Sequence, residues 1–413
     1  MKRFCSVFII LSILVLMFSC ATEMPQKLPE PDGGQTPQEQ DEHEEAPALD
    51  FDIFTPEDNH IFYRRHRYFS NLPGMVLVMD QEIHSGGVHL SYIHKTNQKE
   101  YYFCFDPLCD HCECATGYAG LFAQPWYFVW SLADQNLYAL CGKNFTMLNT
   151  DGALYRFDMN TQEVEIVVPT NGNSIREIFT GDRYILMQRD RAEGGCDILR
   201  FDPLSGDYQT ITPPPGRTFL GIYAAGNTVL VRYMDSPYFH LTDPSFANYT
   251  QTALTTCEFI VGNMAYGTTD ADGAFTIKEA LSRNICSYNI LTNAVETLVS
   301  QENAGVVCVG CDGDYIYYGL YDLDESDPTK TTTRQTGLYR VSIHGGDAEK
   351  MMDFERAQTN FEADYFANQV MCFDGVLYGV LHPVKSTGLG DIYGVLTQKD
   401  DGLWTFSKLP VGD

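Results

Sequence analysis

Two stretches of sequence, 44 residues apart, decide the fold. They are residues 155–167, Tyr-Arg-Phe-Asp-Met-Asn-Thr-Gln-Glu-Val-Glu-Ile-Val, and residues 199–211, Leu-Arg-Phe-Asp-Pro-Leu-Ser-Gly-Asp-Tyr-Gln-Thr-Ile. Each begins with an apolar or aromatic strand, passes through a polar turn and continues into a second strand. We therefore predict that each is a β-hairpin and the outer half of a repeating unit.

The same pattern recurs along the chain. Weaker copies lie at residues 92–103, 287–298, 339–351 and 393–406. A second hairpin-like element precedes most copies, at residues 136–140, 182–187, 227–231, 314–318 and 375–380. Two hairpins per unit make four strands, at a spacing near the roughly 40 to 50 residues of a propeller blade. Six copies predict an all-β fold, a six-bladed β-propeller.

One interval in this series is too long. The copies beginning at Leu199 and Ser287 are 88 residues apart, twice the shortest spacing. Either a seventh, degenerate blade lies in residues 235–275, or one blade carries an insertion such as 237–272. Because residues 240–256 lack a clear strand pair, we expect six blades with an insertion. A β-sandwich is the competing fold, but it would not produce such regular repeats.

The N-terminus has the order of an export signal. Two positive charges, Lys2 and Arg3, precede an apolar run over residues 4–18 that is too short to span a bilayer. Ser19 and Cys20 resemble the end of a bacterial lipobox, which predicts a lipoprotein signal peptide over residues 1–20 and a lipidated Cys20. The alternative is an ordinary signal peptide with Cys20 as an incidental thiol. The expected location is extracytoplasmic, with a lipid anchor as the only membrane contact.

Residues 21–58 have a different composition from the rest. They are rich in proline and acidic residues, with Lys27 as the only basic residue. Such a segment buries too little apolar area to offset chain entropy. We predict a disordered linker over 21–58 and the propeller over 59–413.

Charge excludes one class of partner. The formal net charge is -28 and the pI is about 4.5. Binding to nucleic acid needs lysine and arginine against phosphates, so we expect no nucleic-acid partner.

The densest group of reactive side chains lies between residues 104 and 114. It comprises Cys104, Cys109, His111, Cys112 and Cys114. Thiolate and imidazole are ligands that zinc prefers, but close cysteines in an exported protein more often form disulfides. Free thiols are the third alternative. We favour a disulfide and expect no metal.

Other cysteines suggest no chemistry. Cys308 and Cys311 lie in an inner-strand pattern, where positions three apart face opposite ways. We expect buried free thiols there, and likewise at Cys141, Cys196, Cys257, Cys286 and Cys372.

The chain resembles a known group of proteins. It resembles lipoproteins of gut Firmicutes that carry propeller domains of unknown function, related to YWTD-like and six-bladed TolB-like propellers. The resemblance lies in the repeat and in the element Cys104-Phe-Asp-Pro-Leu-Cys109-Asp-His111. Cys112 departs from that element and puts any family cysteine pairing in doubt. The resemblance implies the fold and the anchor but no activity.

These observations favour a binding or scaffolding module for a glycan, peptide or protein, in a monomer without a cofactor. The alternative is a polysaccharide hydrolase or lyase with its site at the mouth of the propeller channel. No Walker, dinucleotide or GxSxG motif appears, and no residue can be named catalytic because propeller sites are assembled from separate loops.

Overall fold

A computed structural model describes residues 61–63, 69–80, 89–102, 124–142, 153–158, 161, 163–169, 175–181, 183–269, 282–302, 304–322, 335–354, 365–383, 391–400, 402 and 404–409. The chain divides into two units, Met1–His43 and Glu44–Asp413, and all described residues lie in the second. The signal peptide, Cys20 and the whole linker therefore lie outside the described residues, as does the group from Cys104 to Cys114.

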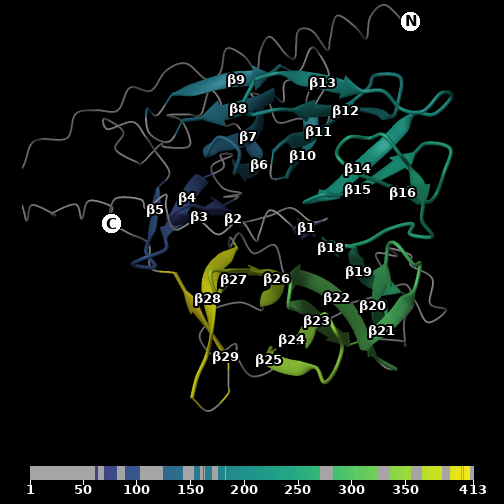
Figure 1. The fold of residues 1–413 in the computed structure, drawn as a ribbon. Coiled ribbons are helices and arrows are strands. Elements are labelled where there is room, and N and C mark those ends of the chain that lie inside the picture. The colour runs from purple at the N-terminus through teal and green to yellow at the C-terminus, as the bar shows by residue number, and fades with distance from the viewer. Residues whose placement is uncertain are drawn as a thin grey trace, which may run out of the picture. The chain divides into compact units, whose positions relative to one another are not determined.

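Every regular element in the described part of the chain is a strand, which confirms the predicted all-β class. The described residues contain no helix that is long and apolar enough to cross a membrane. The strands form antiparallel meanders of four consecutive strands each. Figure 1 shows them following one another from β2 to β29.

The first three meanders are β2 (Phe69–Leu72), β3 (Met75–Asp80), β4 (His89–His94) and β5 (Glu100–Tyr102); β6 (Gln124–Ser131), β7 (Asn136–Gly142), β8 (Ala153–Phe157) and β9 (Val164–Val168); and β10 (Ile175–Thr180), β11 (Ile185–Asp190), β12 (Cys196–Phe201) and β13 (Tyr208–Ile211). The next two are β14 (Phe219–Ala225), β15 (Thr228–Tyr233), β16 (Phe239–Thr242) and β17 (Thr250–Gln251); and β18 (Phe259–Val261), β19 (Met264–Thr269), β20 (Asn284–Asn289) and β21 (Val295–Ser300). The last two are β22 (Ala304–Cys311), β23 (Tyr315–Asp322), β24 (Gln335–Ser342) and β25 (Glu349–Asp353); and β26 (Tyr365–Phe373), β27 (Val376–Pro383), β28 (Ile392–Gln398) and β29 (Trp404–Lys408).

The two deciding stretches form the predicted outer hairpins. Residues 155–167 lie in β8 and β9, and residues 199–211 form the end of β12 and all of β13. Phe157 and Phe201 are buried at corresponding positions. The aspartate after each caps the turn: Asp158 Oδ1 accepts a hydrogen bond from the amide of Thr161 at 2.9 Å, and Asp202 Oδ1 accepts one from Leu204 at 3.0 Å.

The expected six blades with an insertion are corrected to seven meanders among the described residues. The long interval between Leu199 and Ser287 contains the whole meander β14–β17 and the inner hairpin β18–β19. The meander β14–β17 is joined to the preceding meander in one hydrogen-bonded sheet, but only through the pair Cys196 and Phe219. The outer hairpin escaped the sequence pattern because β17 has two residues, Thr250 and Gln251, and both are exposed.

Consecutive meanders pack against one another through buried apolar clusters. The first and last meanders also meet. Phe69 packs against Tyr378 and Tyr393 with ring centroids 5.7 and 5.9 Å apart, and Lys95 forms an ion pair with Asp374 at 2.5 Å. The sheets therefore close a ring by face-to-face packing, which is the architecture of a β-propeller.

The N-terminal strand β1 (Ile61–Tyr63) does not complete the last blade. It pairs with β18, the first strand of the fifth meander, where Phe62 lies opposite Ile260. Within the described residues, the first and last meanders meet through side chains, and no strand is shared between them.

Candidate functional site

The meander topology gives the propeller two different faces. In each meander the first-to-second and third-to-fourth turns lie at one end of the strands, and the remaining connections lie at the other. We call these the short-turn face and the long-connection face. The longest connections join strand ends at the long-connection face. These connections contain residues that lie outside the described part of the chain: 81–88, 103–123, 143–152, 270–281, 323–334, 355–364 and 384–390.

A pocket of about 670 Å³ opens at the short-turn face of the third meander. Two turns and two strands build it, and its lining side chains are Arg183, Tyr184, Arg200, Asp202, Ser205, Asp207, Tyr208 and Gln209. Its volume is within the range of small-molecule sites in proteins, and its lining combines two aromatic rings with charged and amide groups.

Hydrogen bonds to the fourth meander hold one side of this pocket. The Tyr184 hydroxyl donates to the carbonyl oxygen of Gly226 at 2.6 Å, and Arg200 Nη1 donates to that of Pro244 at 2.8 Å. Both acceptors lie in turns of the fourth meander, so the pocket sits beside the junction of two blades. Tyr208, by contrast, is 38% exposed and free to present its ring to a ligand.

Gln209 faces Arg200 across the hairpin. With the oxygen of its amide directed at the guanidinium, that oxygen accepts hydrogen bonds from Arg200 Nη2 at 2.5 Å and Nε at 3.0 Å. The two turn aspartates differ in surroundings: Asp202 is partly engaged by the amide of Leu204, while Asp207 is exposed.

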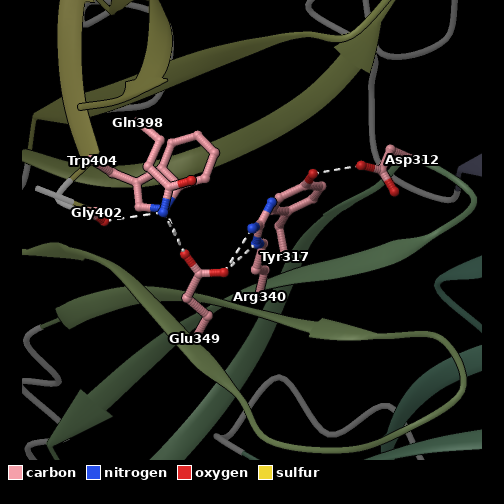
Figure 2. Close-up of polar contacts among 7 residues, drawn as sticks. All are labelled: Asp312, Tyr317, Arg340, Glu349, Gln398, Gly402 and Trp404. Carbon is pink, nitrogen blue, oxygen red and sulfur yellow. Dashed lines mark hydrogen bonds and ion pairs between the residues drawn. The ribbon is translucent and has the colours of Figure 1, made fainter. Parts of the chain in front are cut away.

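A polar network lies at the corresponding position of the sixth meander (Figure 2). Glu349 accepts hydrogen bonds from Arg340 at 2.8 Å, from Trp404 at 2.9 Å and from Gln398 at 3.1 Å. Arg340 lies between the rings of Tyr315 and Trp404, 4.5 and 4.9 Å from their centroids.

The same network continues inward, where Tyr317 donates to Asp312 at 2.5 Å (Figure 2). Burial and then the charge of Asp312 raise the pKa of Tyr317, so the phenol is a fixed neutral donor. The hydrogen bonds of Glu349 join the sixth and seventh meanders, and we interpret the network as structural.

A histidine and an aspartate meet at the long-connection face of the seventh meander. His382 Nδ1 lies 2.5 Å from Asp391 Oδ1, across the end of the β27–β28 pair. The side chain of His382 is 41% exposed and that of Asp391 is 11% exposed. The ring of Phe366 on β26 packs edge-on against the imidazole at 5.3 Å. A largely buried carboxylate thus orients an accessible imidazole, the arrangement of a base and its orienting group.

The structure tests part of the cysteine predictions. Cys196, Cys257, Cys286, Cys308 and Cys311 are buried free thiols, as predicted, whereas Cys372 is only partly buried. The side chain of Cys141 lies outside the described residues. Among the described residues, no three His, Cys, Asp or Glu side chains lie together in a way that could hold a metal ion.

The argument that Cys308 and Cys311 face opposite ways was wrong. A β-bulge between Cys308 and Gly310 shifts the register, and both thiols enter the same apolar cluster.

Sequence reasoning identified the hairpin of residues 199–211 but missed the pocket. One signal was available. Aligned on their arginines, the copies at Arg156 and Arg340 place a glutamate opposite, whereas the copy at Arg200 places Gln209 there. No such signal marked the pair of His382 and Asp391, because neither residue belongs to the repeated pattern.

Comparisons with solved structures find chains that align with most of this protein at low sequence identity. A prolyl endopeptidase structure matches 84% of this chain and 54% of its own with 10% identity and a TM-score of 0.52. An oligogalacturonate lyase from Vibrio parahaemolyticus matches 84% and 93% with 11% identity and a TM-score of 0.49. The β-propeller domain of the Trilobed protease from Pyrococcus furiosus matches 83% and 86% with 11% identity and a TM-score of 0.33.

This chain spans about half the length of the prolyl endopeptidase chain. No protein-family model matches it, and no curated protein does. At these identities the likeness extends to the fold, and the function has to be argued from the sites.

Proposed function

We propose that the protein is a glycan-binding β-propeller whose ligand occupies the pocket of the third meander. The observation that supports this is the lining of the pocket. Exposed Tyr208 offers a ring face to the apolar side of a sugar, while Ser205, Asp207 and Gln209 offer hydrogen-bonding groups for hydroxyls. A sugar has both surfaces on one ring.

A glycan array with the purified protein tests the proposal, followed by titration of the best ligand. Tyr208→Ala should weaken binding about tenfold, since losing about 1.4 kcal/mol of contact is a factor of ten. Leu204→Ala is the matched control: Leu204 lies in the same turn and is 62% exposed, but it does not line the pocket. Equal binding by both variants and the parent protein would place the ligand elsewhere.

We propose further that Cys20 carries a lipid that holds the protein outside the cytoplasmic membrane. The export signal, the lipobox-like Ser19-Cys20 and the resemblance to Firmicutes lipoproteins with YWTD-like or TolB-like propellers support this. Detergent phase partitioning of cell extracts tests it. The protein should enter the detergent phase and the Cys20→Ser variant the aqueous phase; partitioning of both into water would contradict the anchor.

A second candidate function is polysaccharide hydrolysis or lyase cleavage at the long-connection face. The specific observation in its favour is the pair formed by His382 and Asp391, because an accessible imidazole held by a carboxylate can accept a proton from water or from a substrate carbon. Two of the similar structures, a lyase and a prolyl endopeptidase, are enzymes, which fits this function better than a scaffold, although the likeness itself extends to the fold only.

Incubation with polysaccharides, with detection of new chain ends, tests this second function. His382→Ala should abolish cleavage, and Asp391→Asn should lower kcat by disturbing the orientation of the imidazole. His344→Ala is the control, since His344 lies in a turn at the opposite face. Cleavage that survives His382→Ala would remove the pair from the mechanism.

A further inference from the structure

Three outer hairpins carry an arginine at the same place in their third strand. Arg156 lies opposite Glu165, Arg200 opposite Gln209 and Arg340 opposite Glu349. In two hairpins the carboxylate forms an ion pair with the arginine. In the third meander an amide replaces the carboxylate.

Arg200 therefore keeps its charge without a carboxylate partner among the described residues. Its contacts there are the carbonyl oxygen of Pro244 and the amide oxygen of Gln209, which engage three of its N–H groups. A guanidinium has five. Two remain, one on each terminal nitrogen, and can donate to the oxygens of a carboxylate.

The space beside Arg200 is open for a related reason. Ile185 pairs with Phe201 and Ile316 pairs with Val341, so Tyr184 is the counterpart of Tyr315. In the sixth meander Arg340 contacts the ring of Tyr315 at 4.5 Å and the ring of Trp404, from the outermost strand of the next meander, at 4.9 Å. The outermost strand of the meander next to the third is β17, which consists only of Thr250 and Gln251. The pocket of the third meander lies at the position that the polar network occupies in the sixth.

A second cation reaches the same pocket. Arg183 lines it and is exposed. Two aspartates balance the two arginines of the pocket, so its lining is formally neutral in a chain whose formal net charge is -28. Asp202 and Asp207 line it as well and can accept hydrogen bonds from hydroxyls.

We infer that the pocket selects an acidic saccharide, with the carboxylate of a hexuronic acid bound by Arg200 and supported by Arg183. This rests on the proposed glycan binding and adds the charge of the ligand. Tyr208 then faces the sugar ring, and the aspartates of the turn accept from its hydroxyls.

Titration calorimetry with hexuronic-acid oligosaccharides and their methyl esters tests the inference, because the ester keeps the sugar and removes the charge. The protein should bind the acid at least about tenfold more tightly than the ester. Gln209→Glu should remove this preference, since it builds the ion pair found at Arg156 and Arg340. Its melting temperature should not fall, which separates lost selectivity from lost folding.

Glu165→Gln is the matched control. It creates an unpaired arginine in the second meander, whose residues do not line this pocket, and should leave binding unchanged. Equal affinity for acid and ester, with binding still lost in Tyr208→Ala, would overturn the acidic selectivity and leave the glycan site standing. An acid preference that persists in Gln209→Glu would also overturn it, and no binding of either ligand would overturn the glycan proposal as well.

Discussion

Glu349 shows at the level of one residue how the blades are held together. Burial alone would raise the pKa of its carboxyl group, but the hydrogen bonds from Trp404 and Arg340 and the guanidinium charge outweigh burial and lower it. Ionised Glu349 thus binds three donors from two meanders. The protonated acid would lose most of this interaction.

Because the pKa of Glu349 is lowered on folding, its contribution to stability is complete above about pH 4.5, the ordinary value, and is lost as pH falls through the lower folded pKa. Glu349→Gln should cost about 1 kcal/mol at neutral pH, the scale of a partly exposed ionic network, and should reduce the loss of melting temperature on acidification. Glu296→Gln is the control, at an exposed position. Identical acid profiles for the two variants and the parent would refute the role of Glu349.

At the scale of the element, a β-bulge recurs in the first strand of several meanders. Register shifts lie at Pro125/Tyr127, Ile175/Glu177, Phe219/Gly221, Cys308/Gly310 and Ala367/Gln369. Each adds a residue to the strand nearest the axis and increases its local twist. The bulge is thus part of the repeating unit.

Gly310, at one of these bulges, is required by a neighbouring strand. A Cβ atom there would lie 1.8 Å from the carbonyl oxygen of Val370 on β26, which is backbone and cannot turn aside. Gly310→Ala should therefore destabilise the protein by about 1 to 3 kcal/mol, the cost of overpacking, measured by urea unfolding.

The matched control is Gly221→Ala at the bulge of the fourth meander, where the nearest atom is the flexible Gln188 Oε1 at 3.4 Å. That variant should lie within about 0.5 kcal/mol of the parent. Equal losses at both glycines would mean that the bulge itself, and not the approach of Val370, sets the requirement.

Strand alternation and turn chemistry were enough to predict the outer hairpins at Tyr155 and Leu199, because Phe157 and Phe201 alternate with polar neighbours and an aspartate caps each turn. They could not predict the short β17, which has no buried residue. The bulges were equally hidden, since an extra residue breaks the period of two on which the pattern depends. Prediction of the pocket required the register that places Gln209 opposite Arg200, and only an alignment of the repeated copies reveals that register.

At the scale of the whole propeller domain, the closure of the ring depends on one seam. No described strand is shared by the first and last meanders. Ring contacts of Phe69 with Tyr378 and Tyr393, the ion pair of Lys95 with Asp374, and a hydrogen bond from Tyr378 to Gln98 at 3.3 Å hold the seam. A ring closed by side chains opens at its weakest interface first.

Phe69→Ala should destabilise the protein by about 3 to 5 kcal/mol, because Phe69 is fully buried and its removal leaves a cavity between the two meanders. Hydrogen exchange should then accelerate most in β2–β5 and β26–β29. Phe201→Ala, at a position 1% exposed within the cluster between the second and third meanders, should cost a similar amount without singling out those strands. If both variants raised exchange evenly around the ring, the propeller would unfold as one unit and the seam would have no special place in its stability.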